Sequence, residues 1–211
     1  MGYMGMKMGA HTEYVCLPEV SAVTKKPVKS SYEEAGSAMQ GALTALYFLR
    51  HPNLRKGQKI LIYGASGGVG IPAIQLAKHM EAEVTGTCST SKTEIVKSLG
   101  ADKTVDYKNE DFTVTGEIYD VIMDTTGMCP ALKCRKVLKP DGYYLSTTFG
   151  IPQLAKMFWF RSRTGSHLFM GTLKEEAEDM EYLCDLMKSG ELKVPIDKIF
   201  PMEQAAEAHR Y

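Results

Sequence analysis

Hydrophobic residues along the chain fall into short runs separated by turns, and the spacing within each run distinguishes strands from helices. Residues 60–63 form a continuous apolar run, which is typical of a strand buried on both faces of a sheet. The segment 69–80 instead places Ala73, Ile74 and Ala77 on one side, as an amphipathic helix does. The same criteria predict strands at 83–88, 103–106, 119–124, 143–147 and 166–170, and helices at 32–49, 91–99, 130–138, 175–188 and 202–211.

Local signals mark several element ends. Ser31 precedes two acids in the first turn of a predicted helix, where an N-cap and the helix dipole favour them. Residues 139–142, Lys-Pro-Asp-Gly, predict a turn, and Gly190 is expected to end the helix at 175–188. A short strand is expected at 12–17, ended by Pro18.

The alternation of strands and helices at short spacing indicates the fold class. Such spacing is typical of parallel βαβ units. We therefore expect an α/β fold with a doubly wound parallel sheet of six strands. The strand order is expected to be 3-2-1-4-5-6, which is the order of the dinucleotide-binding (Rossmann) fold.

Composition and charge narrow the function classes. The chain has 25 basic and 25 acidic residues, so its zero net charge argues against nucleic acid or an anionic membrane as a partner. No apolar stretch is long enough to span a membrane. The odd number and irregular spacing of the cysteines favour a reducing, cytoplasmic location, and we expect thiols without function at Cys16, Cys88, Cys129, Cys134 and Cys184.

The strongest chemical signal is the glycine-rich turn at residues 64–70, Gly-Ala-Ser-Gly-Gly-Val-Gly. Gly67 would let the backbone approach a pyrophosphate, and Gly70 would let the helix lie close to the sheet. Backbone N–H groups at the helix start would face the phosphates. The position between a buried strand and an amphipathic helix favours dinucleotide binding over a merely structural turn.

The end of the second predicted strand indicates which dinucleotide binds. NAD sites commonly carry an acid here, but residues 88–92 read Cys-Ser-Thr-Ser-Lys. Hydroxyls and an ammonium group can bind a 2′-phosphate, whereas an acid would repel it. NADP is therefore favoured over NAD. The alternative is that Ser89 or Thr90 only caps a helix and that Lys92 is solvated.

With these residues placed, the chain resembles the medium-chain dehydrogenase/reductase superfamily, in its zinc-independent, zeta-crystallin-like quinone oxidoreductase branch. The resemblance extends over nearly the whole chain, in blocks that follow the family's order. These blocks lie at 11–15, 31–35, 41–46, 57–62, 65–70, 98–102, 105–107, 119–121 with Asp124, and 203–211.

The resemblance implies a set of cofactor contacts. Ser66 to Val69 would hold the pyrophosphate, Thr44 lies in the helix that approaches the nicotinamide, and Ser89, Lys92 and Tyr107 would hold the 2′-phosphate and adenine end. For Thr44 and Tyr107 a packing role stays open. The full set is Thr44, Ser66, Gly67, Gly68, Val69, Ser89, Lys92, Tyr107, Thr126, Gly127, Thr147 and Thr148.

The chain departs from the wider superfamily in two respects, its expected metal content and its expected domain organisation. Zinc is not expected, because the closely spaced cysteines of a structural zinc lobe are missing and Gln40 stands where zinc members carry a cysteine ligand. The chain also looks truncated at both ends. Residues 1–30 are expected to be a connector and a remnant of a GroES-like β-domain, and residues 31–211 to be the NADP-binding Rossmann domain.

The resemblance implies an NADPH-dependent reductase of quinones or α,β-unsaturated carbonyls, present here mainly as its cofactor-binding part. A non-catalytic NADPH-binding or regulatory protein and, less favoured, a zinc-dependent alcohol dehydrogenase are the alternatives. No catalytic residue is assigned, since His11 and Tyr14 fit structural roles better. Residues 157–160, with Trp159, fit a substrate lid, an oligomer contact or a core segment. The sixth strand is a candidate edge for a homodimer.

Overall fold

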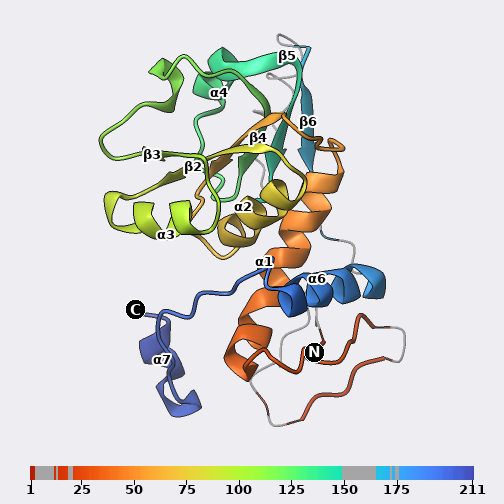
Figure 1. Cartoon of the computed structure of the whole chain (residues 1–211). Helices are drawn as coiled ribbons and strands as arrows, with labels where there is room; N and C mark the ends of the chain where they lie inside the picture. The colour runs from red at the N-terminus through yellow and green to blue at the C-terminus, as the bar shows by residue number, and fades with distance from the viewer. Residues whose placement is uncertain (3–11, 13, 19–20, 149–164, 172, 174–175) are drawn as a thin grey trace.

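A six-stranded sheet organises the chain in the computed structural model, which describes residues 1–2, 12, 14–18, 21–148, 165–171, 173 and 176–211 (Figure 1). Every neighbouring pair of strands is parallel, and the order is β3-β2-β1-β4-β5-β6. The predicted fold class and strand order are therefore confirmed. The strands are β1 Lys59–Tyr63, β2 Glu83–Cys88, β3 Lys103–Asp106, β4 Tyr119–Asp124, β5 Leu138–Ser146 and β6 His167–Met170.

Helices cover both faces of the sheet, because the central strands are apolar on both sides. On β1, the buried residues Ile60 and Ile62 pack into a core with α1, α2, α3 and α6, while Leu61 packs into a second core with α4. Figure 1 shows the long α1 running beside α2 and crossing α6. The α-helices are α1 Tyr32–Arg50, α2 Gly70–His79, α3 Thr93–Ser98, α4 Ala131–Val137, α6 Ala177–Ser189 and α7 Ala205–Ala208; the 3₁₀ turns are η1 Thr90–Lys92, η2 Phe112–Val114 and η3 Met202–Gln204.

The predicted helix ends are confirmed at α1 and α6. The Ser31 hydroxyl accepts from the backbone N–H of Glu34, and the Glu34 carboxylate accepts from the N–H of Ser31, which makes a capping box. Gly190 ends α6 in the left-handed region, with φ of 82°. No helix of the described residues is long and apolar enough to cross a membrane.

Two local predictions were wrong. Residues 14–17 form no strand: Tyr14 is 89% exposed, and no described strand lies beside this segment to bond with it. The turn expected at 139–142 is an irregular part of β5, because the register passes from Tyr119 opposite Leu138 to Val121 opposite Tyr143. Asp141 has the positive φ of 62° that the Lys-Pro-Asp-Gly sequence favours.

The GroES-like remnant expected in residues 1–30 stays a prediction. Among the described residues of this segment, the only bridge is an isolated antiparallel one between Gly2 and Val23. His11 lies outside the described residues, as does the apolar segment 157–160.

Candidate cofactor-binding site

A groove of about 530 Å³ opens at the carboxyl ends of β1 and β4. In the sheet order, β2 and β3 lie on one side of β1, and β4, β5 and β6 lie on the other. The place where the order reverses is the switch point of the fold, and ligands of doubly wound folds bind at this point, beyond the carboxyl ends of the strands. The groove is lined by Ser37, Gln40, Gly41, Thr44, Tyr63, Gly64, Ser66, Gly67, Gly68, Val69, Thr87, Tyr107, Thr125, Thr126 and Met128.

Neighbouring strands hold the glycine-rich loop in place. The Thr87 hydroxyl at the end of β2 accepts from the N–H of Gly64 at 3.1 Å, and the Thr87 carbonyl accepts from the N–H of Ala65 at 2.9 Å. From β4, the Thr125 hydroxyl contacts the carbonyls of Tyr63 at 2.9 Å and Gly64 at 3.1 Å. The loop is therefore fixed from both sides before any ligand binds.

Two glycines permit close approaches that a larger residue would prevent. A Cβ on Gly70 would lie 2.2 Å from the Gly64 carbonyl oxygen, which agrees with the prediction that this residue lets α2 approach the sheet. A Cβ on Gly41 would lie 1.9 Å from the Gly68 carbonyl oxygen, so α1 also packs directly on the loop. Gly41 was part of the family resemblance, but its contact with the loop was not predicted.

The loop presents backbone donors to the groove. In the described part of the chain, no acceptor bonds to the N–H groups of Ser66, Gly68 or Val69, all of which line the groove. N–H groups at the start of a helix that have no protein acceptor can bond to water or to an anion. Three such donors at the start of α2 suit a pyrophosphate, so the residues present fit a dinucleotide.

Asp124 organises the loop that follows β4, a role that sequence reasoning missed. Its side chain is buried, and Oδ1 accepts from the N–H groups of Thr126 at 3.0 Å and Gly127 at 2.9 Å. Oδ2 accepts from the N–H of Cys129 at 3.1 Å and from the Tyr144 hydroxyl at 3.0 Å. The available signal was an aspartate that ends an apolar strand and precedes Thr-Thr-Gly.

The end of β2 carries the groups predicted for a 2′-phosphate. Ser89 is half-buried, and its hydroxyl lies 3.2 Å from that of Ser91. Lys92 is exposed and forms no ion pair with any described residue. Neither side chain lines the groove itself.

One acid stands closer to this region than the sequence suggested. Asp106 ends β3 opposite Cys88, and its carboxylate accepts from the Thr90 hydroxyl, the Lys108 N–H and the Asn109 amide. These hydrogen bonds, that of Thr90 foremost, lower the pKa of Asp106. The carboxylate is therefore engaged by protein donors, although it is negative at neutral pH.

Some of the predicted cofactor-contact residues line the groove, and others do not. Thr44, the 66–69 loop, Tyr107 and Thr126 line it together. Tyr107 is 52% exposed, whereas the Thr44 hydroxyl donates to the Gln40 carbonyl within α1. Gly127, Thr147 and Thr148 are not among the lining residues. They lie near Asp124 instead. The Thr147 N–H donates to the Asp124 carbonyl. Gly127 packs against Thr148 so closely that a Cβ on Gly127 would lie 2.3 Å from the Thr148 hydroxyl oxygen.

The described residues contain no group of three or more His, Cys, Asp or Glu side chains placed to hold a metal ion. Gln40, which stands where zinc-binding members of the superfamily are expected to carry a cysteine ligand, lines the groove. Tyr63, also in the lining, has a pKa raised mainly by burial, so its phenol is protonated at neutral pH.

The geometry agrees with a family match. Residues 99–211, more than half of the chain, match the family model described as zinc-binding dehydrogenase. The chain belongs to this family. Within the zinc-binding dehydrogenases, its relatives confirm the predicted resemblance to the quinone oxidoreductase branch.

Three relatives indicate how far the similarity extends. A chloroplast envelope quinone oxidoreductase homolog of Arabidopsis thaliana is 32% identical over 95% of this chain and 64% of its own length. An NADPH-dependent alkenal/one oxidoreductase, chloroplastic, of the same plant is 30% identical over 97% of this chain and 50% of its own. The solved quinone oxidoreductase from Coxiella burnetii superposes with a TM-score of 0.81 at 28% identity, covering 89% of this chain and 59% of that structure. The chain thus spans between half and two thirds of these relatives.

Proposed function

We propose that the protein is an NADPH-dependent reductase of quinones or α,β-unsaturated carbonyls, and that this chain supplies its cofactor-binding part. The observation that carries the proposal is the set of unused N–H donors of Ser66, Gly68 and Val69 at the switch point of the sheet. The names of the relatives, which include quinone and alkenal/one oxidoreductases, support the substrate class.

When bound, NADPH supplies the hydride that reduces a quinone or the β-carbon of an enone. The chain's own residues bind and orient the cofactor. The glycine loop donates to the pyrophosphate, and Thr126 and Thr44 line the groove beyond it. Asp124 keeps the 125–129 loop in one conformation through the donors that it accepts.

The preference for NADP over NAD is part of the proposal. Ser89 and Lys92 follow β2 and offer a hydroxyl and an ammonium group that pairs with no acid of the described residues. A 2′-phosphate binds such groups through charge-assisted hydrogen bonds. Asp106 works against this preference, but its carboxylate already accepts three hydrogen bonds from protein donors.

Three further expectations belong to this proposal. The chemistry is zinc-independent, because Gln40 offers a carboxamide in place of a usual zinc ligand. The protein pairs as a homodimer through the outer edge of β6, which would satisfy unpaired backbone groups. It is cytoplasmic, although two of the relatives carry chloroplast names.

Titration of the chain with NADPH and NADH, followed by calorimetry or cofactor fluorescence, tests the proposal. We expect saturable binding of both, with NADPH at least about tenfold tighter, since the extra phosphate adds a charge-assisted contact. Failure to bind either cofactor would refute the site, and a preference for NADH would refute the role of Ser89 and Lys92. Turnover of a simple naphthoquinone by the full-length protein tests the substrate class.

A further inference from the structure

Cys129 and Cys134 form a dithiol pair inside the core that flanks β4 and β5. Their Sγ atoms lie 3.0 Å apart, no disulfide joins them, and both side chains are at least 98% buried. The spacing of the two cysteines in the sequence matches no metal or redox motif and predicts thiols without function. The structure brings the sulfurs within reach of each other.

The start of α4 explains why the pair is so close. Pro130 is the N-cap, so Cys129 lies just before it and Cys134 is the fourth residue of the helix. These are the two positions whose side chains meet in a hydrophobic staple. The N–H groups of Lys133 and Cys134 both donate to the Pro130 carbonyl, which fixes the first turn. Since a disulfide needs sulfurs about 2 Å apart, the pair must close by only about 1 Å.

We propose that Cys129 and Cys134 form a reversible redox-modification site. Hydrogen peroxide is the oxidant. One thiolate attacks the peroxide oxygen and becomes a sulfenic acid as the O–O bond breaks, releasing the first water once its leaving oxygen is protonated. The second thiolate displaces the sulfenic oxygen as a second water and forms the S–S bond. Two thiols and one peroxide thus give one disulfide and two waters, and a dithiol reductant returns both protons and both electrons.

The position of the pair couples it to the cofactor groove, a consequence that rests on the proposed function. The N–H of Cys129 donates to Asp124 Oδ2, and the same carboxylate holds the N–H groups of Thr126 and Gly127. Thr126 and Met128 line the groove. Closing the disulfide draws Cys129 toward α4 and displaces this loop, so the oxidised form binds NADPH more weakly.

The other cysteines serve as internal references. Cys88 and Cys184 are buried, but no second thiol contacts either of them in the described part of the chain, and burial raises the pKa of each thiol. Cys16 is exposed and is the cysteine most accessible to dissolved oxidants. Its replacement by serine removes intermolecular disulfides as a competing product.

The first experiment treats the Cys16→Ser protein with hydrogen peroxide under native conditions and maps its peptides by mass spectrometry. We expect one intramolecular 129–134 disulfide, seen as a loss of two hydrogen masses and reversed by dithiothreitol. Cys129→Ser and Cys134→Ser, made separately in this background, should abolish the product, whereas the buried-thiol control Cys184→Ser should retain it. Thiols at 129 and 134 that stay reduced while the protein remains folded, or that oxidise no faster than Cys184, would overturn the proposal.

The second experiment titrates the reduced and oxidised forms with NADPH. We expect oxidation to weaken binding about fivefold or more, as a typical coupling between two sites does, and dithiothreitol to restore it. Equal affinities would overturn the coupling to the groove. If the reduced protein binds no NADPH, the proposed function fails instead, and the mass measurement still decides whether the redox site exists.

Discussion

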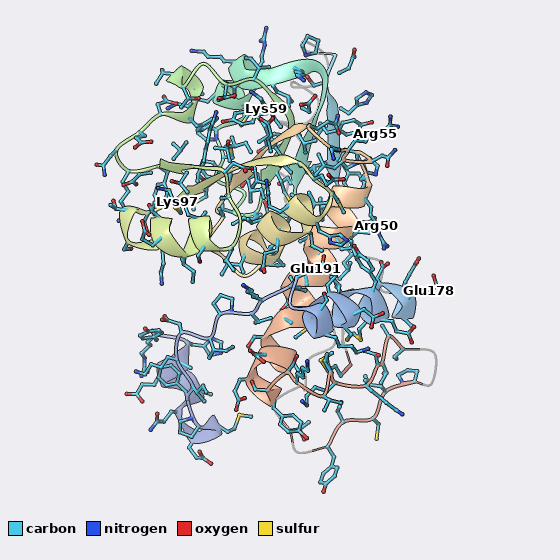
Figure 2. All side chains as sticks on the ribbon, in the orientation of Figure 1. Arg50, Arg55, Lys59, Lys97, Glu178 and Glu191 are labelled. Atoms are coloured by element: carbon cyan, nitrogen blue, oxygen red, sulfur yellow. The ribbon has the colours of Figure 1, made fainter. Side chains whose placement is uncertain are left out.

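At the amino-terminal edge of the sheet, charged side chains pair with one another, whereas at the carboxyl-terminal edge three backbone donors have no acceptor among the described residues. Glu117 forms ion pairs with Lys59 at 2.7 Å and with Lys103, and Lys139 pairs with Asp120 at 2.6 Å. Figure 2 shows Lys59 at the start of β1, remote from Lys97 on α3. At the opposite edge, the N–H groups of Ser66, Gly68 and Val69, residues that line the groove, have no bonded acceptor in the part of the chain that the structure describes.

The difference distinguishes the amino ends of the strands, which have a structural role, from the carboxyl ends, which form the binding site. These two ends are called the amino edge and the carboxyl edge below. The ion pairs at the amino edge join exposed lysines to the half-buried carboxylates of Glu117 and Asp120. Their charges are balanced within the protein, and solvent screening of the lysines limits what each pair adds to stability. At the carboxyl edge, one buried carboxylate, Asp124, accepts several hydrogen bonds from the loop after β4 and shapes that loop, while the neighbouring glycine loop presents donors to an anion. Two aspartates of the same strand, Asp124 and Asp120, therefore have different consequences when removed.

The largest effect is expected for Asp124→Ala. The substitution leaves the buried donors of Cys129 and Tyr144, and the part-buried donors of Thr126 and Gly127, without this acceptor. We expect a loss of at least about 3 kcal/mol in the free energy of unfolding and a loss of NADPH binding in the protein that remains folded. Urea unfolding and cofactor titration measure the two effects.

Asp120→Ala is the matched control, because Asp120 lies on the same strand at the other edge. It accepts from the Lys59 N–H at 2.9 Å and from Lys139, so its loss should cost roughly 1 kcal/mol. NADPH affinity should stay unchanged. Equal effects of the two substitutions on cofactor binding would contradict the division between the edges.

The strands of the sheet could be predicted from the sequence because each buried strand is a short run of apolar residues that is recognisable without its neighbours. The apolar run at 60–63 suits a strand covered on both faces, and Ile60, Leu61 and Ile62 are indeed buried. The glycines at 67 and 70, placed between a strand and a helix, favour a phosphate loop. The strand expected at 12–17 failed because a strand needs a partner, and Tyr14 and Val15 have none beside them among the described residues.

The hidden features of the site depend on contacts between segments distant in sequence. Asp124 is recognisable as an organising residue only once Tyr144 of β5 is placed against it. Asp106 approaches Thr90 through the pairing of β3 with β2, which no local pattern specifies. The Cys129–Cys134 pair was readable in principle, but only with Pro130 fixed as the N-cap.

A smaller loss of NADPH affinity is expected on replacing Lys92, which lies outside the groove. This substitution tests whether the cofactor site includes the residues after β2. Lys92→Ala should weaken NADPH binding about tenfold, because it removes a charge-assisted contact with the 2′-phosphate, and should leave NADH binding unchanged. Lys97→Ala, on the next turn of α3, removes the same charge as a control (Figure 2). If both variants weaken NADPH equally, the effect is one of general charge rather than a contact.

The smallest effect is expected at the amino edge and depends on pH. The hydrogen bonds from Lys103 and Lys59 lower the pKa of Glu117 from about 4.5 to about 2. Because this pKa is lowered in the folded state, the ion pairs stabilise the fold above about pH 4.5, and their contribution falls as the pH drops toward 2.

The melting temperature should therefore be lower for Glu117→Gln than for the unchanged protein at pH 7, and the gap should shrink steadily between pH 4.5 and pH 3. Glu110→Gln, which removes an exposed carboxylate without an ion pair to any described residue, should show no such trend. NADPH affinity at pH 7 should be the same in all three proteins, since the charges at this edge lie away from the groove. A gap that widens on acidification would mean that Glu117 is protonated more readily in the folded state, and the amino edge would then not be held by its ion pairs.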